Sequence, residues 1–156
     1  MTCGLIMTKN PVTVDEAATV GDAAKLLVAR HHLTLPVVDA TGRFAGMFGT
    51  ENLLCQLVPR VALAGGLVSN LRFMTDDPDD LRKRYREIAS RPVGEVADRD
   101  VVTVHPDTPE IEALRLFCKN RETIAVVDRE TRKLLGVVSP SDALRAITGL
   151  KSLAGV

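Results

Sequence analysis

The sequence has no tryptophan, and aromatic residues make up only 3% of its 156 positions. Single-stranded nucleic acids are usually held by bases stacked on aromatic side chains, so this class of ligand is disfavoured. An excess charge of either sign is lacking too, because 20 Lys and Arg residues balance 20 Asp and Glu residues. Without a basic excess, we do not expect binding to nucleic acid or to an anionic membrane.

Cysteines and long apolar runs are also scarce. The three cysteines, Cys3, Cys55 and Cys118, lie far apart and form no C-x-x-C pair. This spacing predicts free thiols rather than a disulfide framework, and no metal site. No apolar run reaches the roughly 18 residues of a membrane-spanning helix, and the N-terminus lacks a signal pattern. We therefore expect a cytoplasmic protein.

What the sequence does contain is an internal repeat. Each copy predicts a strand, an amphipathic helix, two strands and a second helix. A copy of this size buries little surface alone, so the two copies should pack face to face around one core. We therefore expect an α/β (α+β) fold of two β-α-β-β-α repeats with pseudo-twofold symmetry. The segments that recur 89 or 90 residues later are 12–14 with 102–104, 37–39 with 126–128, and 46–48 with 136–138.

An insert separates the repeats. It ends in a predicted helix that Asp77 caps and Pro78 begins, with Leu81, Tyr85 and Ile88 on one face. Either its basic side chains form a docking surface, or the helix packs on the core with its charges in solvent. The predicted boundaries are repeat one at 1–57, the insert at 58–92, repeat two at 93–150 and a C-terminal tail at 151–156.

One motif has the residues for binding chemistry. At 136–142 a strand ends and a helix begins, and Ser139 with Asp142 three residues later forms a capping-box pattern. That pattern alone explains both residues. The same geometry also suits a nucleotide, because a helix N-terminus attracts phosphate and a nearby carboxylate can accept the hydroxyls of a ribose. No nucleophile elbow, P-loop or H-E-x-x-H motif accompanies it, so we expect no enzyme activity.

The repeated order resembles a tandem pair of cystathionine β-synthase (CBS) domains, also called a Bateman module. The resemblance is carried by the opening at 6–14, the L-P-V-V-D strand at 35–39 and the G-h-h-S-x-x-D ending at 136–142. It covers nearly the whole chain apart from the insert. It implies a regulatory unit that needs no cofactor and binds AMP, ADP, ATP or S-adenosylmethionine in a cleft between the repeats. It also implies a homodimer, commonly a flat disc.

The resemblance assigns roles to individual residues. It places the phosphate on Ser139 and the ribose on Asp142, and it places the adenine against the first strand and the start of the L-P-V-V-D strand. The predicted nucleotide contacts are Ser139, Asp142, Thr8, Pro11, Val12, Leu33, Thr34 and Leu35. Arg121 is added because it precedes the matching strand of repeat two, where it is either a phosphate contact or an ordinary surface arginine.

Repeat one departs from this pattern. Gly49 replaces the hydroxyl and Asn52 replaces the carboxylate, while Thr50 can substitute for the missing hydroxyl. We therefore predict one competent cleft and a second, degraded one. Two functions remain open: a nucleotide sensor that signals in trans to an unknown protein, and an interaction module without a physiological ligand. Nucleic-acid binding through the Arg-rich insert is a distant third, because it requires a basic excess.

Overall fold

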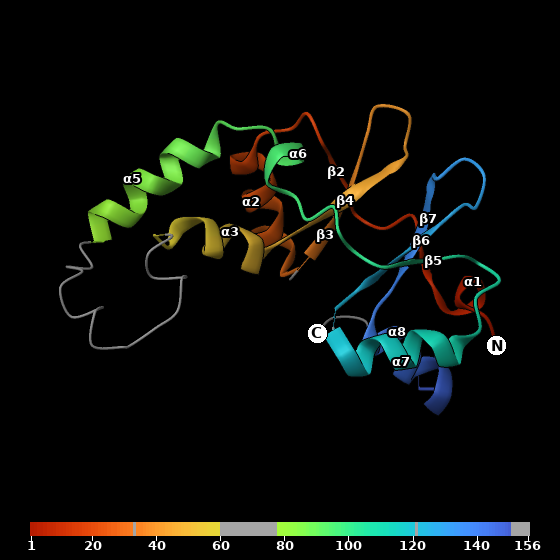
Figure 1. Cartoon of the computed structure of the whole chain (residues 1–156). Coiled ribbons are helices and arrows are strands. Elements are labelled where there is room, and N and C mark those ends of the chain that lie inside the picture. The colour runs from red at the N-terminus through yellow and green to blue at the C-terminus, as the bar shows by residue number, and fades with distance from the viewer. Residues whose placement is uncertain (33, 60–77, 121, 151–156) are drawn as a thin grey trace.

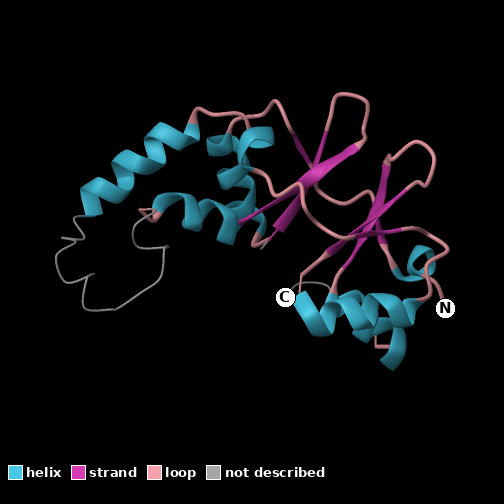
Figure 2. Cartoon of the chain, viewed as in Figure 1, coloured by secondary structure: helices cyan, strands magenta, loops and turns pink. Residues whose placement is uncertain are grey.

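The computed structural model describes residues 1–32, 34–59, 78–120 and 122–150. The strands lie in the middle of the molecule and the helices lie on its outer sides (Figure 2). Repeat one contributes β2 (Val14–Asp15), α2 (Val20–Arg30), β3 (Thr34–Val38), β4 (Phe44–Gly49) and α3 (Thr50–Leu57). Repeat two contributes β5 (Thr103–Val104), α7 (Glu110–Asn120), β6 (Ile124–Val127), β7 (Leu134–Val138) and α8 (Pro140–Thr148). Two short elements, α1 (Cys3–Ile6) and β1 (Thr8–Lys9), come before β2 in the chain. Two helices, α5 (Pro78–Ala89) and α6 (Val93–Val96), come between α3 and β5, as labelled in Figure 1.

Each repeat builds one small sheet with the same scheme. In repeat one the strand order is β2-β3-β4, with β2 parallel to β3 and β3 antiparallel to β4. In repeat two β5, β6 and β7 pair in the same way, and β1 is added at the β7 edge. The central strands are continuous apolar runs because both of their faces are covered. The predicted fold class is confirmed.

The segment that leads into each repeat, which we call the lead of that repeat, packs on the other repeat. β1 leads into repeat one, yet it pairs with β7 and places Thr8 opposite Val137. The lead of repeat two packs on repeat one in the same way, because Asp98 forms an antiparallel β-bridge with Met47 of β4. The two pairings are equivalent, because 90 residues separate Thr8 from Asp98 and Met47 from Val137. This exchange ties the repeats into one unit.

A pseudo-twofold axis runs between Arg43 and Lys133. These two residues occupy equivalent positions 90 apart in the sequence, and they form an antiparallel bridge with each other. A residue that meets its own equivalent must lie at the axis. On either side of the bridge, the backbone hydrogen bonds between the two hairpins repeat with the same symmetry.

The prediction of one shared core is wrong in detail. Each repeat has its own apolar cluster between its sheet and its helices, which we call the repeat-one and repeat-two clusters. A smaller third cluster, Met47 with Ala125 and Val127, joins the two sheets. The exchanged leads complete the larger clusters, since Cys3 of α1 lies in the repeat-two cluster and Val93 of α6 in the repeat-one cluster. The core divides because each sheet carries helices on its own outer face.

The insert helix begins at Pro78, as predicted, whereas Asp77, its predicted cap, lies outside the described residues. α5 contacts both α2 and α3. Ile88 packs against the repeat-one cluster, which supports the interpretation of a helix packed on the core. The one-turn helices α1 and α6 are absent from the prediction, because four residues carry no helical periodicity. No helix in the described ranges is long and apolar enough to cross a membrane.

Candidate functional site

The motif that contains Ser139 and Asp142 lies where β7 ends and α8 begins. Ser139 is the N-cap, and its Oγ accepts a hydrogen bond from the Asp142 amide at 3.1 Å. Asp142 Oδ2 accepts bonds from the Ser139 amide at 2.9 Å and from the Ser139 hydroxyl at 2.8 Å. The capping box expected from the sequence is therefore formed.

Two further side chains converge on the other oxygen of Asp142. Thr8 Oγ1, from β1, donates to Asp142 Oδ1 at 3.2 Å, and Arg145 Nη1 donates to the same atom at 3.0 Å. The Asp142 side chain is buried, with only 6% of the residue exposed. We call Thr8, Ser139, Asp142 and Arg145 the Asp142 cluster. Sequence reasoning missed Arg145, although its position three residues after Asp142 on one helix face was a usable signal.

The Asp142 carboxylate is fully engaged within the protein. It accepts four hydrogen bonds, which is about the full capacity of a carboxylate. A ligand diol that bonds to Asp142 must therefore displace one of these donors, and the hydroxyls of Thr8 and Ser139 are the two that a sugar hydroxyl can replace in kind. The Arg145 side chain is 44% exposed, so its remaining donors can meet an anion beside α8. The cluster can thus exchange internal hydroxyl donors for those of a sugar, next to a guanidinium.

The equivalent motif in repeat one is simpler. Gly49 is the N-cap of α3, and its amide donates to Asn52 Oδ1 at 2.9 Å. Thr50 is the first residue of the helix and is half-buried. Asn52 thus caps its own helix with a neutral oxygen, and neither Gly49 nor Asn52 offers a hydroxyl or a carboxylate.

The other predicted contacts lie partly in the core. Pro11 and Val12 are half-buried, and Val12 packs against the repeat-one cluster. Thr34 is half-buried at the start of β3, whereas the Leu35 side chain lies within the repeat-one cluster. Leu35 can therefore meet a ligand only through its backbone. Leu33 and Arg121 lie outside the described residues.

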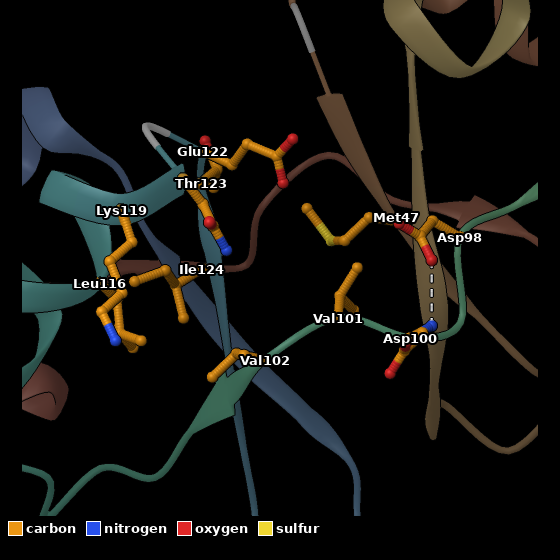
Figure 3. A pocket seen from close by; sticks show the side chains of 11 residues that line it. Met47, Asp98, Asp100, Val101, Val102, Leu116, Lys119, Glu122, Thr123 and Ile124 are labelled. Atoms are coloured by element: carbon orange, nitrogen blue, oxygen red, sulfur yellow. Dashed lines mark hydrogen bonds between the residues drawn. The ribbon is translucent and has the colours of Figure 1, made fainter. Parts of the chain in front are cut away.

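A cavity of about 470 Å³ opens elsewhere between the repeats, and we call it the Asp98 cavity. Met47 and Asp98 stand on one side of it, and the end of α7 and the start of β6 stand on the other (Figure 3). None of the described residues predicted as ligand contacts lines it. It is instead the pseudo-symmetric equivalent of the predicted adenine site. In sequence, Thr8, 11–12 and 34–35 of that site correspond to Asp98, 101–102 and 123–124 of the cavity.

Charge distinguishes the Asp98 cavity from the Asp142 cluster. Asp98, Asp100 and Glu122 border the cavity, and Lys119 is the cation among the lining residues that the structure describes. The Glu122 carboxylate extends into the open space in Figure 3, and the Asp98 carboxylate accepts the Asp100 amide at 3.0 Å. This excess of negative charge repels a phosphate. Within the described residues, no three His, Cys, Asp or Glu side chains are grouped to hold a metal ion.

Both repeats match the same family model. The CBS domain model matches residues 4–58 and 93–149. The chain belongs to the CBS domain family. It carries two CBS domains in tandem, one for each repeat, and the insert lies between the two matched stretches.

Solved structures of other CBS pairs share this fold. CBSX2 from Arabidopsis thaliana is 24% identical, with a TM-score of 0.73 and coverage of 95% of this chain and 94% of that one. CBSX2 in complex with AMP is 23% identical, with a TM-score of 0.71 and coverage of 97% and 98%. The CBS pair of protein MJ0100, in complex with 5′-methylthioadenosine and S-adenosyl-L-methionine, is 22% identical, with a TM-score of 0.64 and coverage of 94% and 99%.

Two curated relatives are much longer than this chain. L-aspartate semialdehyde sulfurtransferase from Methanocaldococcus jannaschii is 24% identical over 147 residues, which are 94% of this chain but 23% of that protein. Uncharacterized protein MJ1232 from the same organism is 25% identical over 137 residues, or 88% of this chain and 36% of that protein. The chain therefore corresponds to one part of each of these proteins.

Proposed function

We propose that this CBS pair is a regulatory module that binds an adenosine nucleotide and signals in trans to another protein. The nucleotide binds at the Asp142 cluster, with its ribose on Asp142, its phosphate beside Ser139 and Arg145, and its adenine against 11–12 and 33–35. It acts as a regulatory ligand in the cytoplasm rather than as a required cofactor. The module catalyses no reaction, and it works as a homodimer.

The observation that carries this proposal is the contact between Thr8 and Asp142. The two residues are 134 positions apart, yet Thr8 Oγ1 lies 3.2 Å from the Asp142 carboxylate. A helix cap needs only Ser139 and Asp142, so the cap alone does not account for a third element at this carboxylate. A ligand at Asp142 would touch the lead of repeat one and α8 of repeat two together. It would thereby bias how the two repeats pack.

Charge favours the Asp142 cluster over the Asp98 cavity for a phosphorylated ligand. The carboxylates of Asp98 and Asp100 have neutral equivalents in the predicted adenine site, namely Thr8 and Asn10. The Asp142 cluster adds the guanidinium of Arg145, which suits phosphate recognition. We therefore assign the phosphorylated nucleotide to the Asp142 cluster and none to the acidic cavity.

The similar proteins support the class of ligand without naming its member. CBSX2 forms a complex with AMP, and the CBS pair of protein MJ0100 forms one with 5′-methylthioadenosine and S-adenosyl-L-methionine. All three ligands contain adenosine and differ at the 5′ position. A residue set that grips the ribose, as proposed for Asp142, would serve each of them.

A thermal-shift panel tests the proposal on wild type, Asp142→Ala and the matched control Asn52→Ala. Each variant is compared with its own unliganded form in AMP, ADP, ATP, S-adenosylmethionine and NADH. A ligand at about 100 times its Kd adds about 2.7 kcal/mol of stability, which raises the melting temperature by several degrees. We expect such a shift in wild type and Asn52→Ala and its loss in Asp142→Ala.

Two results would count against a nucleotide at the Asp142 cluster. A shift that survives in Asp142→Ala but vanishes in Asn52→Ala would move the ligand to the degraded site of repeat one. No shift with any compound would favour the second candidate, an interaction module without a ligand. The observation that favours this candidate is the internal saturation of the Asp142 carboxylate, which needs no ligand to satisfy it.

A further inference from the structure

The insert helix α5 lies on the outside of repeat one, where it contacts α2 and α3 (Figure 1). Its first half, residues 78–83, is exposed throughout. The half-buried residues all belong to the second half, and their spacing places them on one face of the helix: Arg84, Tyr85, Ile88 and Ala89. α5 is therefore held on repeat one along a single short stripe.

Three contacts define what this stripe binds. Arg84 Nη1 donates to the Leu57 carbonyl at 3.1 Å, at the negative end of the α3 dipole. Ile88 packs against the repeat-one cluster. Ala89 lies so close to α2 that a Cβ added to Gly21 would stand 3.2 Å from the Ala89 carbonyl oxygen. We call the surface of α2 and α3 around Gly21 and Leu57 the α5-binding surface. It accepts an arginine, an apolar side chain four positions later and then a small residue.

The attachment of α5 is weak compared with that of the other helices of repeat one. None of the twelve described residues of α5 is buried. Within the described ranges, the buried members of the repeat-one cluster come from β2, α2, β3, β4 and α6 rather than from α5. Segments with few buried apolar contacts open at a low free energy. The helix can therefore leave its place without unfolding repeat one.

The chain that follows α5 is fixed more firmly. The Val20 amide at the start of α2 donates to the Arg91 carbonyl at 2.9 Å, and Thr19 forms a bridge with Pro92. When α5 leaves the surface it thus stays attached close by, at a high effective concentration. A free helix must compete with this attached one.

The α5-binding surface is specific to repeat one. The equivalent of Gly21 in α7 is Ile111, whose side chain is 71% exposed. A helix that approached α7 as closely as α5 approaches α2 would clash with this side chain. The absence of a side chain at Gly21 is therefore what admits a closely packed helix.

We propose that α5 is an autoinhibitory cap, which occupies in cis a surface of repeat one that binds a helix of another protein. The partner is an amphipathic helix with the same pattern as α5, namely an arginine, an apolar residue four positions later and a small residue after it. This contact goes beyond the nucleotide sensor proposed above and requires no bound nucleotide. A partner helix gains access only as α5 opens.

A labelled peptide of residues 78–92 tests the cap on the full chain. The substitutions Arg84→Ala and Ile88→Asp together, the double variant, remove the contacts with Leu57 and with the repeat-one cluster. Neither side chain is buried, so the variant should fold, which circular dichroism verifies. We expect fluorescence anisotropy to show peptide binding to the double variant that is about tenfold tighter, or more, than binding to wild type. A peptide that carries the same two substitutions is the control and should bind neither protein.

Gly21→Ile gives the α5-binding surface the side chain that repeat two has at Ile111. When it is added to the double variant, it should abolish peptide binding. Three outcomes would overturn the proposal: equal affinity of wild type and the double variant, no binding to the double variant, and binding that persists with Gly21→Ile. Since no nucleotide is present, none of them bears on the nucleotide sensor.

Hydrogen exchange of the wild-type chain provides a second measurement without substitutions. The amides of α5 should exchange through local opening, and therefore faster than the amides of α2, whose residues Val20, Ala23 and Leu27 are buried in the repeat-one cluster. Equally slow exchange in α5 and α2 would mean that α5 opens only when repeat one unfolds. A helix of that kind could not serve as a displaceable cap.

Discussion

Thr8 and Asp142 stand at opposite ends of the sequence and are joined by a hydrogen bond of 3.2 Å. Thr8 belongs to β1, and Asp142 belongs to α8, the last helix of the described ranges. Their pseudo-symmetric equivalents are Asp98 and Asn52. One half of the molecule therefore has a hydroxyl and a carboxylate where the other half has a carboxylate and an amide. The two halves share a backbone plan and differ in chemistry.

Asp142→Ala should lower the free energy of unfolding by about 1–3 kcal/mol, because it removes a cap and the carboxylate that accepts a hydrogen bond from the Thr8 hydroxyl. The matched change Asn52→Ala removes one oxygen that accepts from the Gly49 amide, so we expect a loss of about 1 kcal/mol or less. Urea denaturation monitored by circular dichroism measures both. Equal losses would mean that the bonds from Thr8 and Arg145 contribute nothing to stability.

Gly136→Ala should weaken the packing of β1, in the lead of repeat one, against β7 of repeat two. A Cβ at Gly136 would lie 2.6 Å from the Thr8 carbonyl oxygen and 2.8 Å from Met7 Sδ, so β1 must move away from β7. Overpacking of this kind costs about 1–3 kcal/mol. Hydrogen exchange measured by NMR should show faster exchange of amides along β1 and β7.

Gly42→Ala provides the contrast for this prediction. Gly42 has φ of +84° and nothing within 4 Å of an added Cβ, so its cost comes from backbone strain alone. It should lower stability by about 1 kcal/mol without changing the β1–β7 exchange rates. If Gly136→Ala leaves those rates unchanged as well, the close approach of the two strands is not required.

The sequence predicts the two repeats far better than it predicts that the lead of each repeat packs on the other. Recurring apolar segments locate the hairpins and helices, because each has enough residues to show a period. β1 is only two residues long, so nothing local indicates that Thr8 pairs with Val137 rather than within its own repeat. The Asp98 cavity escapes prediction for the same reason. It exists only because the lead that contains Asp98 crosses to Met47.

Asp39 and Asp128, in the turns after β3 and β6, should respond to acid in the same way. Hydrogen bonds from the Thr131 amide and then its hydroxyl hold the pKa of Asp128 below its usual range. The Thr41 hydroxyl does the same for the pKa of Asp39. Protonation therefore favours the unfolded chain. The stabilisation is complete above about pH 4, the usual Asp pKa, and is lost as pH falls through the lower folded pKa.

The Asp128→Asn variant checks this response. Asn retains an acceptor for the Thr131 amide and hydroxyl but does not titrate. The difference in melting temperature between wild type and Asp128→Asn should therefore be largest near neutral pH and should shrink below about pH 4. A difference that stays constant from neutral to acid pH would show that the carboxylate charge adds nothing beyond its geometry.

The three thiols should separate by reactivity in dilute protein, where copies are apart. Cys3 is fully buried, and burial, followed by the negative charge of Glu110, raises its pKa. It therefore forms less of the reactive thiolate than an ordinary thiol at the same pH. Cys55 and Cys118 are exposed, so we expect a thiol reagent to modify these two first. Cys3 should react only as the repeat-two cluster opens.

Mass spectrometry over time measures the order, and denatured protein is the control in which all three should react alike. Fast reaction of Cys3 in the folded chain would mean that α1 detaches readily from repeat two, and that the exchanged lead is weaker than its buried contacts indicate.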